Sequence, residues 1–289
     1  MLASAPGGPQ GEGMEIPVAS PELSLALARA ALAAGAAILR HAGGVEATAK
    51  ADGSPVTVAD AEAETIILAA LAALLPGVSV VAEESAAREG APAVSGPFIL
   101  VDPLDGTRDF VAGRPEYTVN IALIVAGCPV LGVVYAPALS RLWLGDSAGA
   151  RCADIAPGGD PARAGWQPMA VRKAPATGLT ALVSRSHATP ETEAHLARWP
   201  VAQRLPSGSS LKFCLIGEGK GDLYPRFGPT MEWDTAAGDA VLRAAGGGVF
   251  SPEGGLMTYG HAARGYRNGD FVALGDLTLV ENLKRHARS

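Results

Sequence analysis

Two aspartates lie three residues apart at the end of an apolar stretch, in the run Phe-Ile-Leu-Val-Asp-Pro-Leu-Asp over residues 98–105. An apolar run that ends in acids is typical of a buried strand that brings its carboxylates to the edge of a sheet. Pro103 fixes its own φ and restricts Asp102 to extended geometry, so Asp102 and Asp105 are held in place. Mg²⁺ prefers oxygen ligands in near-octahedral geometry. The run therefore predicts part of a site for a hard divalent cation.

Gly106 and Thr107 follow this acid pair and offer a place for a helix to begin. Backbone N–H groups at a helix N-terminus bind phosphate oxygens, so a phosphate site would adjoin the cation site. The plain alternative is an Asp-Gly turn with a capping threonine and no chemistry. The five residues Asp-Pro-Leu-Asp-Gly alone leave both interpretations open.

Other carboxylates lie at the expected ends of regular elements. Glu83 and Glu84 end a short strand that begins near residue 78, and Asp234 begins a predicted helix. Each has an ordinary interpretation, because paired glutamates in a loop are usually solvated and an acid in a first helical turn interacts with the helix dipole. Asp60 likewise follows Thr57 by three residues, in the spacing of a capping box. Together these acids lie at the ends of rigid elements, where functional sites are built.

The elements that must position these acids alternate along the chain. Hydrophobic periodicity and capping signals predict helices over 21–41, 58–75, 190–199, 209–218 and 234–245, with one more at the C-terminus. Strands are predicted over 78–81, 98–101, 118–125, 130–135, 141–144, 179–184, 223–224 and 271–274, with a loop over 86–96 and a hairpin turn over 126–129. The pattern indicates α/β layering, at least in the second half.

Composition divides the chain into three expected parts. Residues 1–19 are rich in Gly, Pro and Ala, lack a secretory signal, and are expected to form a disordered leader. Residues 149–176 show weak periodicity, so we predict an N-terminal α+β portion over 20–175 that binds the metal and a C-terminal α/β portion over 176–289.

Charge and cysteine usage exclude some classes of function. With 48% hydrophobic and 18% charged residues, the 289-residue chain is globular. A net charge of −6 gives no indication of nucleic-acid binding, so an anionic substrate needs local cations or metal ions. The three cysteines lie far apart, which predicts neither disulfides nor zinc and suits a cytoplasmic, reducing compartment. The apolar stretch 23–39 contains Arg29 and many alanines, so it is expected to be a packed helix rather than a membrane span.

From about residue 20 onward the chain resembles the inositol monophosphatase family of metal-dependent, lithium-sensitive phosphatases. Three motifs carry the resemblance in order, Glu-Glu-Ser at 83–85, Asp-Pro-Leu-Asp-Gly-Thr at 102–107 and Trp-Asp-Thr-Ala-Ala-Gly at 233–238. Within the family it is similar to the bacterial 3′(2′),5′-bisphosphate nucleotidases of sulfur assimilation, through Ser-Gly-Ser-Ser-Leu-Lys-Phe-Cys at 207–214 and Tyr-Pro-Arg-Phe-Gly-Pro-Thr at 224–230. The resemblance implies a layered αβαβα fold with the site between its two portions.

The resemblance also implies a role for each matching residue. The side-chain ligands of two or three Mg²⁺ ions would be four carboxylates, with a fifth oxygen from the Leu104 carbonyl: Glu83, Asp102, Asp105 and Asp234. Thr107 and Asp60 would orient and deprotonate the attacking water, with Glu83 also in a catalytic role. The N–H groups of Gly106 and Thr107 would hold the phosphate.

The substrate implied is adenosine 3′,5′-bisphosphate or its sulfated form, cleaved at the 3′-phosphate. A second phosphate needs cations, and Lys212 and Arg226 lie in the two segments that mark the subfamily. Ser209 and His187 are further candidate contacts, and Asp234 would also face the substrate. Lys212 has an alternative as a solvated helix lysine, and His187 as an exposed loop residue.

Two other functions remain open at this point. A phosphatase for inositol 1-phosphate or another sugar phosphate would favour carboxylates or amides near the last metal ligand, where this chain has Arg226 and Glu232. A non-catalytic nucleotide or metal sensor could dispense with Asp60 and Thr107. The expected partner is a small phosphorylated molecule, and neither monomer nor homodimer, nor peripheral attachment at the inner membrane, is decided by the sequence.

Overall fold

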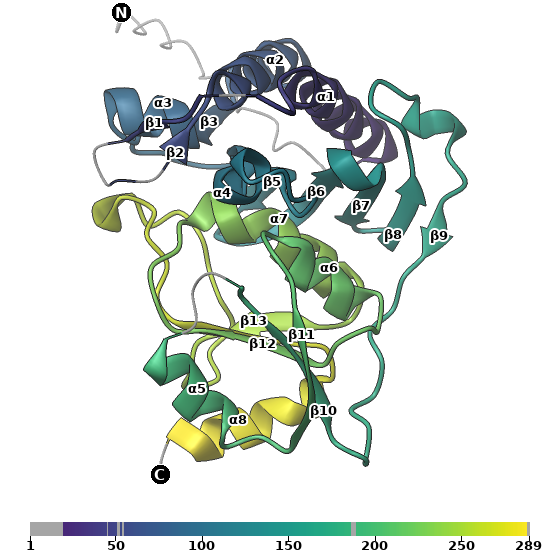
Figure 1. Cartoon of the computed structure of the whole chain (residues 1–289), viewed down its shortest axis with the longest axis vertical. Helices are drawn as coiled ribbons and strands as arrows, with labels where there is room; N and C mark the ends of the chain where they lie inside the picture. The colour runs from purple at the N-terminus through teal and green to yellow at the C-terminus, as the bar shows by residue number, and fades with distance from the viewer. Residues whose placement is uncertain (1–19, 45, 51–52, 54, 186–188, 288–289) are drawn as a thin grey trace, which may run out of the picture.

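The computed structural model describes residues 20–44, 46–50, 53, 55–185 and 189–287, and the leader predicted over 1–19 lies outside them. Five layers follow one another in Figure 1: helices α1 and α2, a large sheet, helices α6 and α7, a small sheet, and helices α5 and α8. This arrangement confirms the expected αβαβα class. The division into portions at residue 176 stays a prediction.

The large sheet has seven strands in the order β3-β4-β5-β6-β7-β8-β9. Their bounds are β3 (Ser79–Ala82), β4 (Phe98–Asp105), β5 (Thr118–Val125), β6 (Cys128–Ala136), β7 (Arg141–Asp146), β8 (Gly149–Asp154) and β9 (Gln167–Pro168). Strand β3 is parallel to β4, and every later pair is antiparallel. The predicted four-residue turn is wrong, because Ala126 and Gly127 turn alone with φ of 49° and 76°, as two-residue hairpins require.

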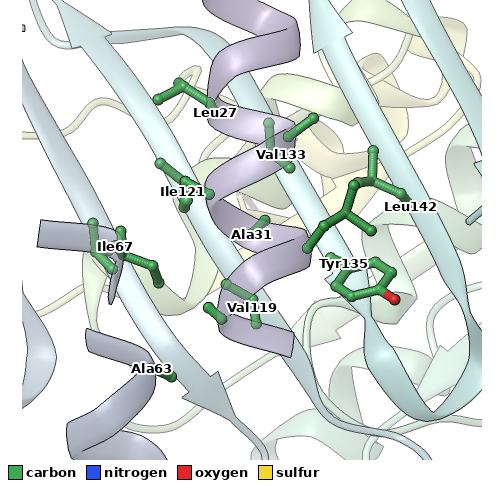
Figure 2. Close-up of a cluster of buried hydrophobic side chains, with 14 of the residues drawn as sticks. Leu27, Ala31, Ala63, Ile67, Val119, Ile121, Val133, Tyr135 and Leu142 are labelled. Atoms are coloured by element: carbon green, nitrogen blue, oxygen red, sulfur yellow. The ribbon is translucent and has the colours of Figure 1, made fainter. Parts of the chain in front are cut away.

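Helices α1 (Pro21–Arg40) and α2 (Val58–Leu74) cover one face of this sheet. Leu27 and Ala31 of α1 meet Val133 and Tyr135 of β6 in the core that Figure 2 shows. Small residues let α1 lie close to the sheet, since a Cβ on Gly35 would come within 2.4 Å of the Tyr135 ring. By length and composition α1 could cross a bilayer, yet 56% of that stretch is buried inside the protein, as the alanine-rich sequence predicted.

Helices α6 (Leu211–Gly217) and α7 (Glu232–Ala244) lie between the sheets. Two glycines on the large sheet let α7 pack closely against it. A Cβ on Gly132 would lie 2.4 Å from the Ala237 carbonyl oxygen, and one on Gly145 would lie 2.5 Å from Val241 Cα. This close packing fixes the N-terminus of α7, which carries Asp234, relative to the large sheet.

The small sheet has the order β11-β10-β12-β14-β13. Its strands are β10 (Leu179–Val183), β11 (Val201–Pro206), β12 (Leu223–Arg226), β13 (Gly248–Phe250) and β14 (Phe271–Leu274), and its outer face is covered by α5 (Pro190–Leu196) and α8 (Val280–Ala287). The sequence prediction missed β11 and β13. Strand β11 is a largely exposed edge strand, and β13 is only three residues long after a run of glycines.

The remaining elements are short. A two-stranded ribbon pairs β1 (Thr48–Ala49) with β2 (Pro55–Val56), and two helices follow strand ends, α3 (Glu83–Glu89) and α4 (Thr107–Val111). The loop predicted over 86–96 therefore begins too early, since Glu83 opens a helix. Single 3₁₀ turns span Pro137–Leu139, Pro161–Arg163, Ala262–Arg264 and Leu277–Leu279.

Candidate active site

The four predicted carboxylate ligands line one cavity of about 400 Å³. Glu83 comes from the start of α3, Asp102 and Asp105 from the end of β4, and Asp234 from the first turn of α7. Glu83 and Asp234, 151 residues apart in the chain, thus meet because β4 lies between β3 and β5 while α7 packs on the same sheet. The cavity also contains Leu104, Gly106, Thr107, Ser209, Lys212 and Arg226.

The charges of these carboxylates act strongly on one another. Burial raises the pKa of Asp102 well above its usual range, and the neighbouring Glu83, Asp105 and Asp234 raise it further. Burial, Asp105 and Glu83 also raise the pKa of Asp234, and burial raises that of Glu83. Buried acids that repel one another are stabilised by a cation, and their oxygen donors suit Mg²⁺.

The acids do not form a closed coordination sphere. Within the described part of the chain, no three Asp, Glu, His or Cys side chains converge on a single ion-sized point. Lys50 contributes positive charge instead, with its Nζ 2.6 Å from Glu83 and 2.7 Å from Glu84. Burial would lower the pKa of Lys50, but the two glutamates outweigh it and raise it. The carboxylates supply hard oxygen donors of the kind that Mg²⁺ prefers, and their assignment as its ligands stays a prediction.

Asp60 lies just outside the cavity and reaches it through Thr107. The Thr107 hydroxyl is 3.0 Å from Asp60 Oδ1 and 3.1 Å from the Leu104 carbonyl oxygen. The other Asp60 oxygen accepts hydrogen bonds from the Thr57 N–H and hydroxyl, at 2.8 and 2.7 Å. The capping-box interpretation is thus confirmed, and the same carboxylate still contacts Thr107. Burial raises the pKa of Asp60.

Backbone and side-chain donors hold Asp105 and Asp234. Asp105 Oδ2 accepts hydrogen bonds from the Ser209 hydroxyl at 2.6 Å and the Ser210 N–H at 2.8 Å. Ser209, predicted as a substrate contact, therefore also fixes a carboxylate, and its φ of 51° shows a strained backbone. Asp234 Oδ2 accepts from the Met231 N–H at 2.8 Å, which caps α7. The other Asp234 oxygen remains for the cavity.

Lys212 and Arg226 contribute buried positive charge to the same cavity. Lys212 Nζ donates to the Ser209 carbonyl at 2.6 Å and lies 4.9 Å above the Tyr224 ring, so the solvated-lysine alternative is wrong. Arg226 donates one N–H to the Pro229 carbonyl at 3.0 Å, but its buried Nε has no partner within the described residues. A buried donor without an acceptor is rare in folded proteins, so this atom indicates a ligand.

Sequence patterns singled out some site residues and missed others. His187 lies outside the described residues. Lys50 and Ser210 were missed as site residues, although Ser210 lies in the Ser-Gly-Ser-Ser run that carries part of the family resemblance. Arg267 lines the cavity without any local sequence signal.

Comparison with known proteins gives a consistent result over most of the chain. The inositol monophosphatase family pattern matches residues 21–279. The 3′(2′),5′-bisphosphate nucleotidase CysQ of Escherichia coli K12 is 42% identical over 219 residues, which cover 74% of this chain and 83% of that protein. The histidinol-phosphatase of Mycobacterium tuberculosis is 34% identical over 215 residues, covering 71% of this chain and 80% of that protein.

Solved structures agree with the sequence comparison. The crystal structure of CysQ from Bacteroides thetaiotaomicron, described as a bacterial member of the inositol monophosphatase family, superposes with a TM-score of 0.74. The two sequences are 35% identical, and the match covers 88% of this chain and 97% of that one. The layered fold is therefore shared over nearly the whole of that protein.

Proposed function

The chain belongs to the inositol monophosphatase family, and from that premise we propose that it is a Mg²⁺-dependent phosphatase that removes the 3′-phosphate of adenosine 3′,5′-bisphosphate. The observation that carries this choice of substrate is the pair of buried cations, Lys212 and Arg226, in the same cavity as the four carboxylates. Neither side chain forms an ion pair with a carboxylate of the described residues, and both donate to backbone carbonyls, so a second phosphate would give them an anionic partner. We place the enzyme in the cytoplasm, acting on a small phosphorylated molecule.

The metal-binding residues in this proposal are five oxygen donors: Glu83, Asp102, Asp105, Asp234 and the Leu104 carbonyl. When bound, two or three Mg²⁺ ions would neutralise charge on the ester and acidify the attacking water. The protein positions these donors before binding, because Asp105 is held by Ser209 and Ser210 and Asp234 by the start of α7.

The Asp60 and Thr107 pair would act as the proton acceptor. The Thr107 hydroxyl can direct its proton to Asp60 Oδ1, which leaves an oxygen lone pair to accept a hydrogen bond from the water. Burial raises the pKa of Asp60, and this makes its carboxylate a stronger base. The N–H groups of Gly106 and Thr107, at the start of α4, would hold the phosphate under attack.

The direct test is phosphate release with Mg²⁺ from three esters, adenosine 3′,5′-bisphosphate, inositol 1-phosphate and histidinol phosphate. We expect the bisphosphate to have the highest kcat/KM. The second candidate is a phosphatase for a singly phosphorylated metabolite, which similarity to a histidinol-phosphatase favours. A higher kcat/KM for either monophosphate would select that candidate, and no turnover of any ester would favour the sensor.

We expect Arg226→Ala to raise KM for adenosine 3′,5′-bisphosphate by roughly tenfold or more, because a charge-assisted hydrogen bond is lost. KM for adenosine 3′-monophosphate, which has no second phosphate, should change much less. Steady-state kinetics on both substrates measure this difference. Arg204→Ala, which removes an arginine of β11 outside the cavity, should change neither value. Equal effects of Arg226→Ala on both substrates would remove Arg226 from the second phosphate.

The same cavity predicts a pH dependence. Burial above all, together with nearby Arg226, lowers the pKa of Lys212 to about 8, although Asp105, Glu116 and Asp109 oppose the shift. Lys212 is therefore charged below about pH 8 and loses its charge as the pH rises through that value. The ratio of KM for the bisphosphate to KM for the 3′-monophosphate should rise above that pH. Lys212→Met should abolish this rise, and a ratio that stays flat in the wild type would contradict the prediction.

A further inference from the structure

An asparagine occupies a buried position in β5 where packing favours an apolar residue. Asn120 is 1% exposed and lies opposite Asp102 in the pairing of β5 with β4. Side chains alternate between the two faces of a strand, and Ala122, the next residue on the same face, packs in an apolar core with Ala237 of α7. Asparagine is depleted in strands and mostly exposed in proteins. Packing alone therefore does not account for Asn120.

The side-chain amide of Asn120 is satisfied on one side only. Its Nδ2 donates to the Ser210 hydroxyl oxygen at 3.0 Å. Its Oδ1 is buried and has no hydrogen-bond partner among the residues that the structure describes. A buried acceptor without a donor destabilises a fold, and native proteins contain few of them. An apolar side chain of similar size would avoid this cost, which indicates that the amide N–H has a function beyond stability.

Ser210, which accepts that hydrogen bond, connects two of the proposed metal ligands. Its N–H donates to Asp105 Oδ2 at 2.8 Å, and its hydroxyl oxygen lies 2.7 Å from the Asp234 carbonyl oxygen and 3.1 Å from Asp105 Oδ2. A hydroxyl has one proton and two lone pairs. Because the Asn120 N–H occupies a lone pair, the hydroxyl proton is directed to the other side, where the Asp234 carbonyl is the nearer acceptor.

The Ser210 side chain has no competing structural role at its own helix. Ser210 is the N-cap of α6, a position where a serine hydroxyl usually accepts a hydrogen bond from the first turn. Here the side chain makes no such bond. Its described contacts lead instead to Asn120, Asp105 and Asp234. The hydroxyl therefore serves to join the end of β4 to the first turn of α7.

The spacing of the two joined carboxylates matters for the choice of ion. Asp105 ends a strand and Asp234 lies on a helix, so a direct connection between them limits how far they can separate. Mg²⁺ demands nearly ideal octahedral geometry with ligands at about 2.0–2.1 Å, whereas Ca²⁺ accepts flexible geometry at about 2.3–2.6 Å. A fixed spacing favours the smaller ion, and a loosened one favours the larger.

We propose that Asn120 is a positioning residue that, through Ser210, fixes the spacing of Asp105 and Asp234 and so sets the preference of the cavity for Mg²⁺ over Ca²⁺. This inference rests on the proposed function, because it takes both carboxylates as metal ligands. Asn120 itself touches neither the ion nor the ester. Its role is to hold the Ser210 hydroxyl in the one orientation that reaches across to α7.

Asn120→Val tests the proposal, because valine fills the position but has no side-chain N–H to donate. Calorimetric Kd values for Mg²⁺ and for Ca²⁺, measured without substrate, give the ratio of the Ca²⁺ value to the Mg²⁺ value. We expect this ratio to fall about tenfold or more, through weaker Mg²⁺ binding, the usual effect of losing a residue that orients a metal ligand. The melting temperature without divalent ions should not fall, since the unpaired Oδ1 is removed. An unchanged ratio would overturn the inference.

Ser210→Ala provides a second variant, and it should lower the same ratio by a similar factor. Because Asn120 acts through Ser210, the double variant should lose no more selectivity than Ser210→Ala alone, and additive losses would contradict the proposal. Ser24→Ala is the matched control. Ser24 is also a buried serine, and its hydroxyl donates to Asp146 at 2.6 Å, away from the cavity. Its loss should lower the melting temperature and leave the ion preference unchanged.

Two results separate this inference from the proposed function. If the wild type binds both ions but hydrolyses no ester, the proposed function fails and the Kd ratio still tests Asn120. If the wild type binds neither ion, crystal structures of the wild type and Asn120→Val grown without divalent ions test the positioning directly. The variant should then show the Ser210 hydroxyl and the Asp105 carboxylate displaced relative to the Asp234 carbonyl. Identical positions in the two structures would overturn the inference.

Discussion

Asp60→Asn is expected to lower kcat by roughly 10²–10⁴-fold, the usual contribution of a positioned general base, with little change in KM. The substitution keeps the size of the side chain but removes its capacity to accept a proton. An asparagine amide at this place can also no longer accept from both Thr57 and Thr107. The Thr107 hydroxyl can then turn to the Leu104 carbonyl, 3.1 Å away. Steady-state kinetics at saturating Mg²⁺ measure the loss.

Two comparisons separate catalysis from the capping role of Asp60. Thr57→Ala removes the N-cap hydroxyl of α2 and should cost about 1 kcal/mol of stability, while kcat stays within a few-fold of the wild type. Thr107→Val should lower kcat by a factor similar to that of Asp60→Asn. Because the two residues act as a unit, the double variant should lose no more than either single variant. Additive losses would contradict the paired mechanism.

Local sequence was sufficient to predict the secondary structure where the site residues lie on a single element. The run at 98–107 predicted a buried strand that delivers two fixed carboxylates, and it offered a place for a helix to begin at Gly106 and Thr107 while leaving a plain turn open. The structure has the strand over Phe98–Asp105 and a helix that begins at Thr107. The capping signals at Ser20 and Thr57 likewise placed the starts of α1 and α2. In these segments hydrophobic pattern, proline and capping residues all favour one structure, and the tertiary contacts of the folded protein favour the same one.

Local sequence failed to predict the elements whose formation depends on tertiary contacts. Helix α3 was predicted as a loop, yet buried Glu64 of α2 accepts hydrogen bonds from the N–H groups of Glu84 and Ser85 and so caps it from another element. Strand β11 forms because β10 offers it a parallel edge. A local sequence pattern cannot predict an element that depends on hydrogen bonds from a distant segment of the chain.

The meeting of the four carboxylates in one cavity was likewise not predictable from local sequence. Glu83 and Asp234 each had an ordinary local interpretation, and motif resemblance rather than periodicity joined them to Asp102. The structure adds contacts that the motifs do not reveal, the ion pair of Lys50 with Glu83 and the hydrogen bonds of Ser209 and Ser210 to Asp105. Those contacts depend on how the β1–β2 ribbon and α6 pack over the end of β4, which is a property of the assembled fold.

Asp105→Asn should raise the Mg²⁺ concentration for half-maximal activity by roughly tenfold or more, because one of four carboxylates loses its charge. The fold should remain intact, since the asparagine oxygen can still accept from Ser209 and Ser210. Without metal, the variant should melt at the same temperature as the wild type or higher, because repulsion among the buried acids is reduced. Thermal melts with and without Mg²⁺, together with activity titrations, measure both effects.

Asp222→Asn provides the contrast that makes this result specific. Asp222 is fully buried, but it is paired with Arg172 at 2.7 Å and does not line the cavity. Its loss should lower the melting temperature because Arg172 loses its partner, and the Mg²⁺ requirement should not change. The two variants thus have opposite effects. Loss of a carboxylate that binds the metal lowers activity without lowering the melting temperature, whereas loss of a structural carboxylate lowers the melting temperature without changing the Mg²⁺ requirement. An unchanged Mg²⁺ requirement in Asp105→Asn would count against its assignment as a ligand.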